Sequence, residues 1–255
     1  MKSVKMVISA LVLATATSAA AEDLVIRWGT EAGYRPFIYK TSEGELTGLD
    51  VEIGNAICEE LQAKCEWVEQ DWDGIIPGLL GKRYDGILSS MTITEERRRV
   101  IEFSDPYYAT PAGFVGKLDM GLNDDETLAG KTIGVLRGST HASFIINERP
   151  DVTVREYPTQ DEVWLDLTAG RIDASFVNQI AAQEGFLGTE NGEGFGLFGK
   201  SYIDPAVTGS GIGVGFRKAD VELREKVNGA IKAIYENGTF RALNEKYVPF
   251  YIGME

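Results

Sequence analysis

The side chains best suited to binding an ion gather in one short stretch of the sequence. Ser89, Ser90 and Thr92 follow an apolar run at 84–88, and Arg97 stands five residues after Thr92. The apolar run predicts a buried strand, and the residues just before Arg97 are typical of the start of a helix. Hydroxyls and one forked cation are therefore expected at the carboxyl end of a strand, the edge where open α/β sheets bind ligands. A guanidinium there can hold a carboxylate through two parallel N–H groups.

A second set of residues is placed in the same way in the other half of the chain. Leu136, Ser139, Thr140 and His141 follow one predicted strand, and Asn178 follows another. Backbone N–H groups at the start of a helix can hold an anion. Thr140, which opens a predicted helix, would therefore meet the same carboxylate from the opposite side.

A cation site is predicted in the same cleft. Glu31 follows the first predicted strand and supplies negative charge, while Tyr34 and Trp72 supply aromatic faces for a guanidinium or ammonium group. Each feature also has a simpler interpretation: Trp72 as an ordinary core aromatic, Arg97 as a solvated charge, and the hydroxyls as helix caps only. A cleft in which both sets of residues converge would favour the binding interpretation.

Several other kinds of site lack the residues they need. His141 is the only histidine, so a histidine-based catalytic dyad or triad has no spare members. Gly138 lies at the opening of a predicted helix, but no glycine-rich phosphate loop stands at a strand-to-helix turn. No histidine or third cysteine accompanies Cys58 and Cys65 closely enough for a metal site. We therefore expect no nucleotide, no other cofactor and no metal.

The N-terminus predicts export. Two lysines precede an apolar run at 6–16 and an Ala-rich cleavage site, so residues 1–21 are expected to be a removed signal peptide without a lipid anchor. The run is too short to span a membrane. In an oxidising compartment Cys58 and Cys65 are expected to form a disulfide rather than two free thiols. The formal net charge of −14 argues against nucleic acid and anionic lipid as partners.

Two sheets are needed to position these residues. Apolar runs alternate with stretches of helical spacing, which predicts parallel sheets with helices on their faces, first in residues 24–88 and again from residue 128. The expected strands are 24–30, 65–68, 84–88, 131–136, 152–157, 172–177 and 208–216, with a hairpin near 37–49. The expected helices are 51–61 with Asp50 as its cap, 75–80, 137–146, 161–167, 178–187, 221–237 and 239–246, and residues 188–199 are expected to be a loop.

The two units predict a two-lobed α/β protein. The last two helices have no sheet of their own and would complete the first lobe. The expected parts are lobe 1 (22–108 plus 212–255), lobe 2 (112–207) and hinge segments 109–111 and 208–211. Closure of two lobes about such a hinge is a common way of binding a ligand.

The chain resembles the amino-acid-binding branch of the bacterial periplasmic solute-binding proteins that serve ABC importers, above all the lysine/arginine/ornithine- and histidine-binding proteins. The resemblance covers nearly all of the chain after the signal. It is carried by Gly29-Thr30-Glu31, Tyr34, Pro36-Phe37, Gly48-Leu49-Asp50-Val51-Glu52, Asp73-Gly74-Ile75-Ile76-Pro77, the stretch 89–97, the stretch 134–140, the stretch 166–174 and Gly238-Thr239-Phe240.

This resemblance implies a fold, a function and a set of contacts. The implied fold is the type II periplasmic-binding-protein fold, and the implied function is a monomeric periplasmic receptor, not an enzyme, that delivers a cationic L-amino acid to an inner-membrane permease and its ATPase. It implies that Arg97, Thr92 and the Thr140 backbone bind the ligand carboxylate and that Ser90 accepts from the α-amino group. The residues implied around the ligand side chain are Glu31, Tyr34, Trp72, Ser89, Leu136 and His141, and a Cys58–Cys65 disulfide also matches that branch.

One position departs from the family pattern. The family usually has an aspartate that pairs with the α-ammonium, and the residue here is Asn178. An unpaired ammonium in a closed cleft is costly. Either the site is wetter, or the α-nitrogen is substituted, as in opine-like arginine derivatives. Two more alternatives stay open: a cyclohexadienyl dehydratase-type enzyme with Glu31 as its acid, and a detached sensor domain.

Overall fold

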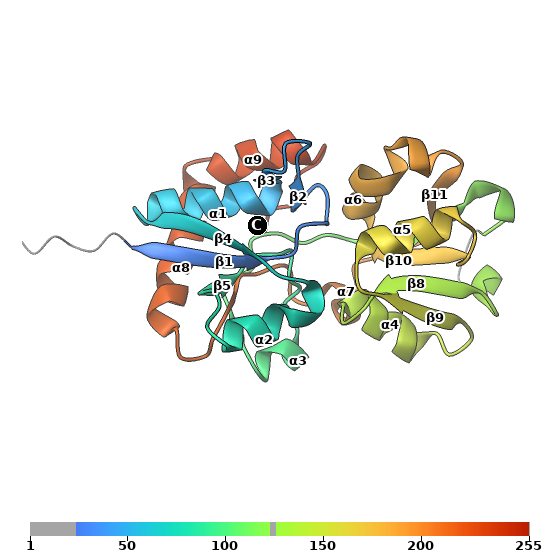
Figure 1. The fold of residues 1–255 in the computed structure, drawn as a ribbon, viewed down its shortest axis with the longest axis horizontal. Helices are drawn as coiled ribbons and strands as arrows, with labels where there is room; N and C mark the ends of the chain where they lie inside the picture. Colours follow the sequence, from blue (N-terminus) through green and yellow to red (C-terminus); the bar gives the residue numbers. More distant parts are fainter. Residues whose placement is uncertain (1–23, 123–125, 255) are drawn as a thin grey trace, which may run out of the picture.

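The computed structural model describes residues 24–122 and 126–254. The predicted signal peptide at 1–21 lies outside the described residues. Two bodies lie side by side, each built on a five-stranded sheet, and the chain crosses between them (Figure 1). The two-lobed α/β fold is therefore confirmed.

The first sheet has the strand order β4-β1-β5-β12-β6. Its strand β1 pairs in parallel with β4 and β5, whereas β12 is antiparallel to β5 and β6. The predicted hairpin is present as β2 (Tyr39–Lys40) and β3 (Leu46–Thr47). The strands of the sheet are β1 (Val25–Thr30), β4 (Lys64–Glu69), β5 (Gly86–Ile87), β6 (Glu102–Phe103) and β12 (Gly215–Phe216).

Helices cover both faces of this sheet (Figure 1). One apolar core joins β1 to α1, α8 and α9, and its members include Ile26, Trp28, Ile57, Ile231 and Phe240. A separate cluster joins α2 to β5 and β6. The helices are α1 (Leu49–Glu60), α2 (Ile75–Leu80), the short α3 (Glu95–Arg98), α8 (Val221–Glu236) and α9 (Thr239–Tyr247). The last two helices thus pack in the core of the first body.

The second sheet has the strand order β11-β7-β10-β8-β9. Strand β8 is parallel to β9 and β10, and β7 is antiparallel to β10 and β11. The strands are β7 (Ala112–Lys117), β8 (Thr132–Leu136), β9 (Thr153–Tyr157), β10 (Ala174–Asn178) and β11 (Phe195–Tyr202). The helices α4 (Thr140–Glu148) and α5 (Gln160–Thr168) pack in different clusters, and α6 (Gln179–Ala182) continues into a π-helical turn, Gln183–Leu187.

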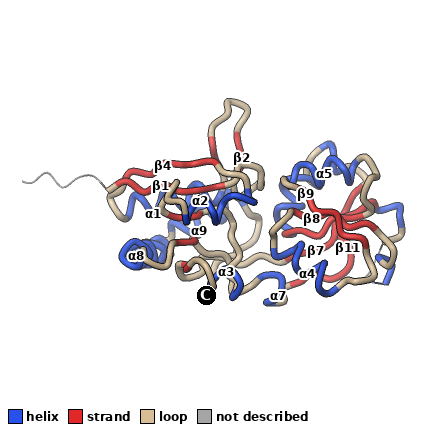
Figure 2. Tube along the Cα trace, turned by 60° about the horizontal axis from the view of Figure 1, so that its bottom comes forward, coloured by secondary structure: helices blue, strands red, loops and turns tan. Residues whose placement is uncertain are grey.

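Two segments connect the bodies and run side by side (Figure 2). One joins β6 to β7, and the other joins β11 to β12 through α7 (Pro205–Thr208). The backbone N–H of Ile212 donates to the carbonyl oxygen of Tyr108 over 2.8 Å, so the segments are tied to each other. The exact lobe boundaries and the hinge residues 109–111 and 208–211 stay predictions.

Two of the expected elements are wrong. Strand β11 begins at Phe195, inside the predicted loop 188–199, because this glycine-rich segment pairs with β7. Of the predicted strand 208–216 only β12 forms. The residues before it make α7 and a connection, and Asp204 caps α7 by accepting from the backbone N–H of Ala206 over 2.8 Å. An aspartate followed by a proline is a recognisable helix start, which the sequence contained.

Asp50 does not cap α1, contrary to the prediction. The helix begins at Leu49, after Gly48 with a φ of 128°, and a Cβ at Gly48 would lie 2.2 Å from the carbonyl oxygen of Phe37. Only glycine fits this backbone and this close approach. Asp50 therefore lies inside the helix, where its side chain is completely buried.

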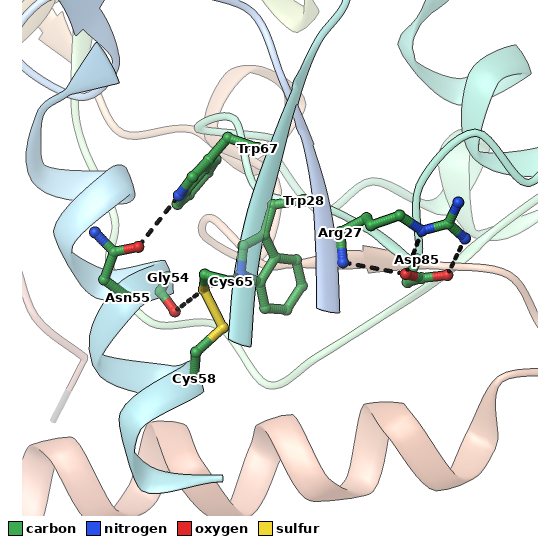
Figure 3. The surroundings of a disulfide bond; sticks show 8 residues. All are labelled: Arg27, Trp28, Gly54, Asn55, Cys58, Cys65, Trp67 and Asp85. Carbon is green, nitrogen blue, oxygen red and sulfur yellow. Dashed lines mark hydrogen bonds and ion pairs between the residues drawn. A yellow bond between two sulfur atoms is a disulfide. The ribbon is translucent and has the colours of Figure 1, made fainter. Parts of the chain in front are cut away.

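The predicted disulfide between Cys58 and Cys65 is present (Figure 3). It ties the last turns of α1 to the start of β4. The indole N–H of Trp28 donates to Sγ of Cys65 over 3.1 Å, and that of Trp67 donates to Oδ1 of Asn55 over 3.1 Å. Covalent and polar contacts thus fix α1, whose first turn carries Asp50, on the first sheet.

Candidate ligand-binding site

A hollow between the two bodies brings the predicted residues together. Counted out to its open mouth, and so including solvent space, it encloses about 360 Å³. Its lining contains ten of the eleven predicted ligand-binding residues and Ser139, namely Glu31, Tyr34, Trp72, Ser89, Ser90, Thr92, Arg97, Leu136, Ser139, Thr140 and His141. Asn178 is the predicted residue that does not line it. The carboxyl ends of strands from both sheets therefore converge, as the sequence predicts.

Arg97 is a buried cation with only neutral partners. Its Nη1 donates to the carbonyl oxygen of Thr92 over 2.7 Å, and its Nη2 donates to that of Gly138 over 3.3 Å. Within the described chain no carboxylate forms an ion pair with it. Burial lowers the pKa of Arg97 to about 10, so the group stays charged at neutral pH. A buried charge without a counterion is costly, and an anion in the hollow would remove that cost.

The start of α4 completes the surroundings of Arg97. Ser139 caps this helix, because its Oγ accepts from the backbone N–H of Ala142 over 3.1 Å and donates to the carbonyl oxygen of Leu136 over 2.6 Å. Thr140 is the first residue of the helix and lines the hollow. The positive end of a helix dipole therefore faces the same space as Arg97, which favours a bound anion.

Trp72 belongs to the surroundings of Arg97 as much as to a cation site. It lies in the 3₁₀ turn Trp72–Gly74 before α2 and is only partly buried. Its ring centroid lies 5.3 Å from Cζ of Arg97, within cation–π range. The ring packs against the apolar cluster of α2, β5 and β6 and also lines the hollow beside the guanidinium of Arg97, so Trp72 belongs to both the core and the site.

Glu31 is a buried carboxyl group without a cation. It lies at the carboxyl end of β1, and its backbone N–H donates to Oγ of Ser89 over 3.0 Å. Burial, followed by the charges of Asp161, Asp71 and Asp73, raises its pKa to about 7. No ion pair of the described residues includes it. A bound cation would favour its ionised form, which is the electrostatic requirement of a cation site.

His141 is a neutral ring in this site. Burial, and then the charge of Arg97, lowers its pKa to about 4. Its ring meets Phe176 edge-on at a centroid distance of 5.8 Å. At neutral pH it therefore shapes the hollow and can hydrogen-bond, but it adds no charge. Burial and the nearby Glu31 raise the pKa of Tyr34 well above its usual value, so that side chain is also neutral.

Asn178 lies beside the main hollow, and its amide oxygen is engaged by the protein. Its Oδ1 accepts from the backbone N–H groups of Ile180 and Ala181 over 2.8 and 3.2 Å, which caps α6, and its Nδ2 donates to Oγ1 of Thr110 over 2.5 Å. Both lone pairs of the amide oxygen are thereby used. Asn178 therefore offers no acceptor to an α-ammonium group.

A second hollow of about 310 Å³ adjoins the first. The two share Tyr34, Ser90, Thr92 and His141. The second is lined further by residues that the sequence did not single out, apart from Asn178, and these are Thr110, Val207, Thr208 and Ile212. Its lining is uncharged. The four additional residues come from the two crossing segments and α7, whose position relative to the site is known only from the fold.

Asp50 is the supporting residue that the sequence did not reveal. Its Oδ2 accepts from the backbone N–H of Ser90 over 2.5 Å, and its Oδ1 accepts from the hydroxyls of Tyr108 and Tyr107 over 3.0 and 3.2 Å. Ser90 has a φ of 48°, in the left-handed region. Burial raises the pKa of Asp50 to about 7, against the opposing effect of these three hydrogen bonds. The sequence did not indicate this role, because Asp50 directly precedes the predicted helix 51–61, a position typical of a helix cap.

The two bodies touch each other around the hollow. Arg137 of the second body forms an ion pair with Asp73 of the first over 2.8 Å, next to the contact between Arg97 and Gly138. Ile180 and Ala181 of α6 belong to the apolar core of the first body. The structure therefore shows the two bodies in contact around the candidate site.

Metal and membrane features are absent from the part of the chain that the structure describes. Residues 24–122 and 126–254 contain no group of three or more His, Cys, Asp or Glu side chains arranged to hold a metal ion. Within the same residues no helix is both long and apolar enough to cross a membrane.

Relatives of known function cover nearly all of this chain. The L-arginine-binding protein of Pseudomonas aeruginosa is 46% identical over 233 residues, which cover 90% of each chain. The lysine/arginine/ornithine-binding periplasmic protein of Escherichia coli is 39% identical over 241 residues, which cover 93% of this chain and 92% of the relative. These relatives are binding proteins, and the periplasm is the compartment of this chain, as predicted.

Solved structures share the fold. An ancestral arginine-binding protein bound to arginine has a TM-score of 0.81 and 32% identity, covering 88% of this chain and 98% of its own. An ancestral amino-acid-binding protein that is a precursor of cyclohexadienyl dehydratase has a TM-score of 0.78 and 29% identity, covering 88% and 95%. Residues 26–250 match the model of bacterial extracellular solute-binding proteins, family 3. The chain belongs to this family.

Proposed function

We propose that this chain is a periplasmic receptor for a cationic L-amino acid of the arginine, lysine, ornithine and histidine class. The observation that carries the proposal is the pair of buried, opposite charges in one hollow, Arg97 and Glu31, neither of which has an ion-pair partner among the described residues. A ligand with a carboxylate and a cationic side chain would neutralise both. The names of the relatives point to the same ligand class.

The residues take distinct roles in this proposal. Arg97 holds the ligand carboxylate together with Thr92 and the start of α4 at Thr140, and Ser90 accepts from the α-ammonium group. Glu31 pairs with the cationic side chain. The remaining wall consists of Tyr34, Trp72, Ser89, Leu136 and His141, with Asn178 behind it in the second hollow.

Binding and release require the hollow to open. In the proposal, lobe 1 (22–108 plus 212–255) and lobe 2 (112–207) move about the hinge segments 109–111 and 208–211. The closed monomer hands its ligand to an inner-membrane permease driven by its ATPase. Small-angle scattering checks the motion, because the radius of gyration should fall when ligand is added to ligand-free protein. An unchanged radius would contradict it.

A second ligand class is supported by the second hollow. It adjoins Ser90, where the α-nitrogen would lie, and its lining is uncharged. Because the side chain of Asn178 supplies neither charge nor a free acceptor, an α-nitrogen whose substituent carries its own carboxylate would suit this space, whose lining holds no acid. Opine-like arginine derivatives are therefore the alternative ligands.

The proposal assigns no catalytic step to the chain. Glu31 is the acid on which a dehydratase of the cyclohexadienyl type would depend, and one structural neighbour is a precursor of such an enzyme. In the proposal the role of Glu31 is to hold a cation. Incubation with prephenate or arogenate should therefore give no turnover, and measurable turnover would revive the enzymatic alternative.

Calorimetry on protein unfolded, dialysed and refolded free of ligand tests the assignment. The ligands are L-arginine, L-lysine, L-ornithine, L-histidine, L-glutamine, octopine and nopaline. Tight binding of the free basic amino acids supports the receptor as proposed, and binding of the two opines alone assigns the alternative class. No binding across the whole panel would refute the cation site.

A further inference from the structure

The buried hydrogen-bond network behind Ser90 contains the carboxyl group of Asp50, which lines neither hollow. Asp50 lies in the first turn of α1, is completely buried and does not line either hollow. The groups that face it are the backbone N–H of Ser90 and the hydroxyls of Tyr107 and Tyr108. Every one of them can donate a hydrogen bond, which is the environment of an ionised carboxylate.

Tyr108 connects this carboxyl group to the ligand site. Its hydroxyl oxygen lies 3.0 Å from Oδ1 of Asp50 and 3.0 Å from Oγ of Ser90. A phenol has one proton, and an ionised carboxylate can only accept. Tyr108 has the geometry to donate to either oxygen. When Asp50 is ionised, the one proton of Tyr108 goes to Asp50, and the hydroxyl proton of Ser90 then points to Tyr108. Ser90 is left with only lone pairs toward the hollow.

The direction of these hydrogen bonds decides what Ser90 can bind. Lone pairs accept from an ammonium group, whereas a hydroxyl proton would repel it. A neutral group in place of the Asp50 carboxylate would let Tyr108 donate to Ser90 and turn the Ser90 proton toward the ligand. Because Asn178 has no free acceptor, the negative charge that a buried ammonium group needs has to come from elsewhere.

We propose that Asp50 is a positioning residue of the ligand site, which through Tyr108 directs Ser90 Oγ to accept from the α-ammonium group of the ligand and supplies the charge that Asn178 lacks. This inference rests on the proposed function, since it requires an amino-acid ligand. Asp50 also holds the backbone of Ser90 in its left-handed conformation. The carboxylate therefore acts on the ligand through one backbone contact and a chain of two hydroxyls.

Two tyrosines offer a matched pair of variants. Tyr107 and Tyr108 are both fully buried and both donate to Oδ1 of Asp50, but only Tyr108 reaches Ser90. Tyr108→Phe removes the link and leaves the contact of Asp50 with the Ser90 backbone. Tyr107→Phe removes one donor to Asp50 and leaves the link intact. Both keep the ring, and equal melting temperatures show that the two variants fold alike.

The probes are L-arginine and 5-guanidinopentanoate, which is arginine without its α-ammonium group. Calorimetry gives the arginine affinities, and displacement of arginine gives those of the analogue. Tyr108→Phe should weaken arginine about five- to tenfold and the analogue no more than about twofold, and Tyr107→Phe should change either by no more than about twofold. Equal losses in the two variants, or equal losses for the two ligands, would refute the inference. If the wild-type protein bound no arginine, the proposed function itself would fail, so the two failures are distinguishable.

Discussion

The two polar supports of the hollow are built in opposite ways. Arg97 is positioned mainly by its neighbours in the chain, because its guanidinium donates to the carbonyl of Thr92 over 2.7 Å and its backbone N–H donates to the capping Thr94. Its remote hydrogen bond, to the carbonyl of Gly138, is longer at 3.3 Å. Ser90 is positioned by remote residues, Asp50 in the first turn of α1 and Tyr108 in a crossing segment. A local arrangement is visible in the sequence, whereas a remote one appears only once the chain is folded.

The charges in these two regions also respond differently to pH. Burial shifts the pKa of Arg97 only to about 10, so this cation is permanent at neutral pH. Burial shifts the pKa values of Asp50 and Glu31 to about 7. The part of the site that binds an anion is therefore constant, and the parts that meet cations can be switched by protons.

The largest expected effect comes from removing the permanent charge. Arg97→Ala should weaken basic amino acids by about 30-fold to several thousandfold, since losing one partner of a buried charge pair costs about 2–5 kcal/mol. Arg98→Ala is the matched control on the same helix, because its partner is Glu102 and it does not line the hollow. Calorimetry measures both. Near-native affinity of Arg97→Ala would remove Arg97 from the site.

A smaller and more selective effect is expected at the cation site. Glu31→Gln should weaken arginine and lysine by about 10- to 100-fold, and glutamine by no more than about threefold, because only the charged side chains need the carboxylate. Asp161→Asn is the comparison: Asp161 lies outside the main hollow and raises the pKa of Glu31, so its loss lowers that pKa and should not weaken arginine. A loss for glutamine as large as that for arginine would be incompatible with a cation site at Glu31.

The pH dependence of binding follows from the direction of the shifts. The pKa values of Glu31 and Asp50 are raised to about 7 in the ligand-free protein, so the protonated forms stabilise its fold at low pH and this contribution is lost as pH rises toward 7. A cationic ligand needs the ionised forms. Arginine affinity should therefore rise between pH 5 and 7, with about two protons released per ligand at the steepest point.

Calorimetry in two buffers of different ionisation enthalpy counts these protons. Glu31→Gln should reduce the number to about one, the share of Asp50. His141 stays neutral over this range, because its pKa is about 4. A wild-type affinity that does not change between pH 5 and 7 would contradict the assignment of both carboxyl groups to the cationic end of the ligand.

The same contrast between local and remote positioning explains which parts of the site could be predicted from the sequence. The strand that precedes Ser89 and the helix cap that precedes Arg97 are adjacent to the residues they position, so their placement followed from local patterns. The role of Asp50 could not be predicted in this way. An aspartate that caps a helix and an aspartate buried in its first turn are followed by the same helical pattern in the sequence. The outcome was decided by Gly48, whose left-handed backbone lets α1 begin one residue before Asp50.

The second hollow marks the other limit of the sequence. Thr110 and Ile212 come from segments that are about 100 residues apart and meet only because the chain crosses twice between the bodies. Asn178 was recognised as a departure from its family, but its engagement with Thr110 and the start of α6 was not predictable. Whether a side chain can still accept a hydrogen bond from a ligand depends on the hydrogen bonds it already makes, and these are known only from the folded structure.

The smallest expected effect separates the backbone of Ser90 from its hydroxyl. A non-glycine residue at a φ of 48° is strained, so Ser90→Gly should raise the free energy of unfolding by up to about 1 kcal/mol. It should also weaken arginine binding about five- to tenfold, since the acceptor for the ammonium group is lost.

Two control variants separate these effects. Ser90→Ala keeps the backbone strain and should show the loss of affinity alone. Lys82→Gly, at an exposed φ of 60°, should show the stabilisation alone. Denaturant unfolding and calorimetry measure the two quantities, and equal stabilities of the alanine and glycine variants would mean that the Asp50 contact holds Ser90 without measurable strain.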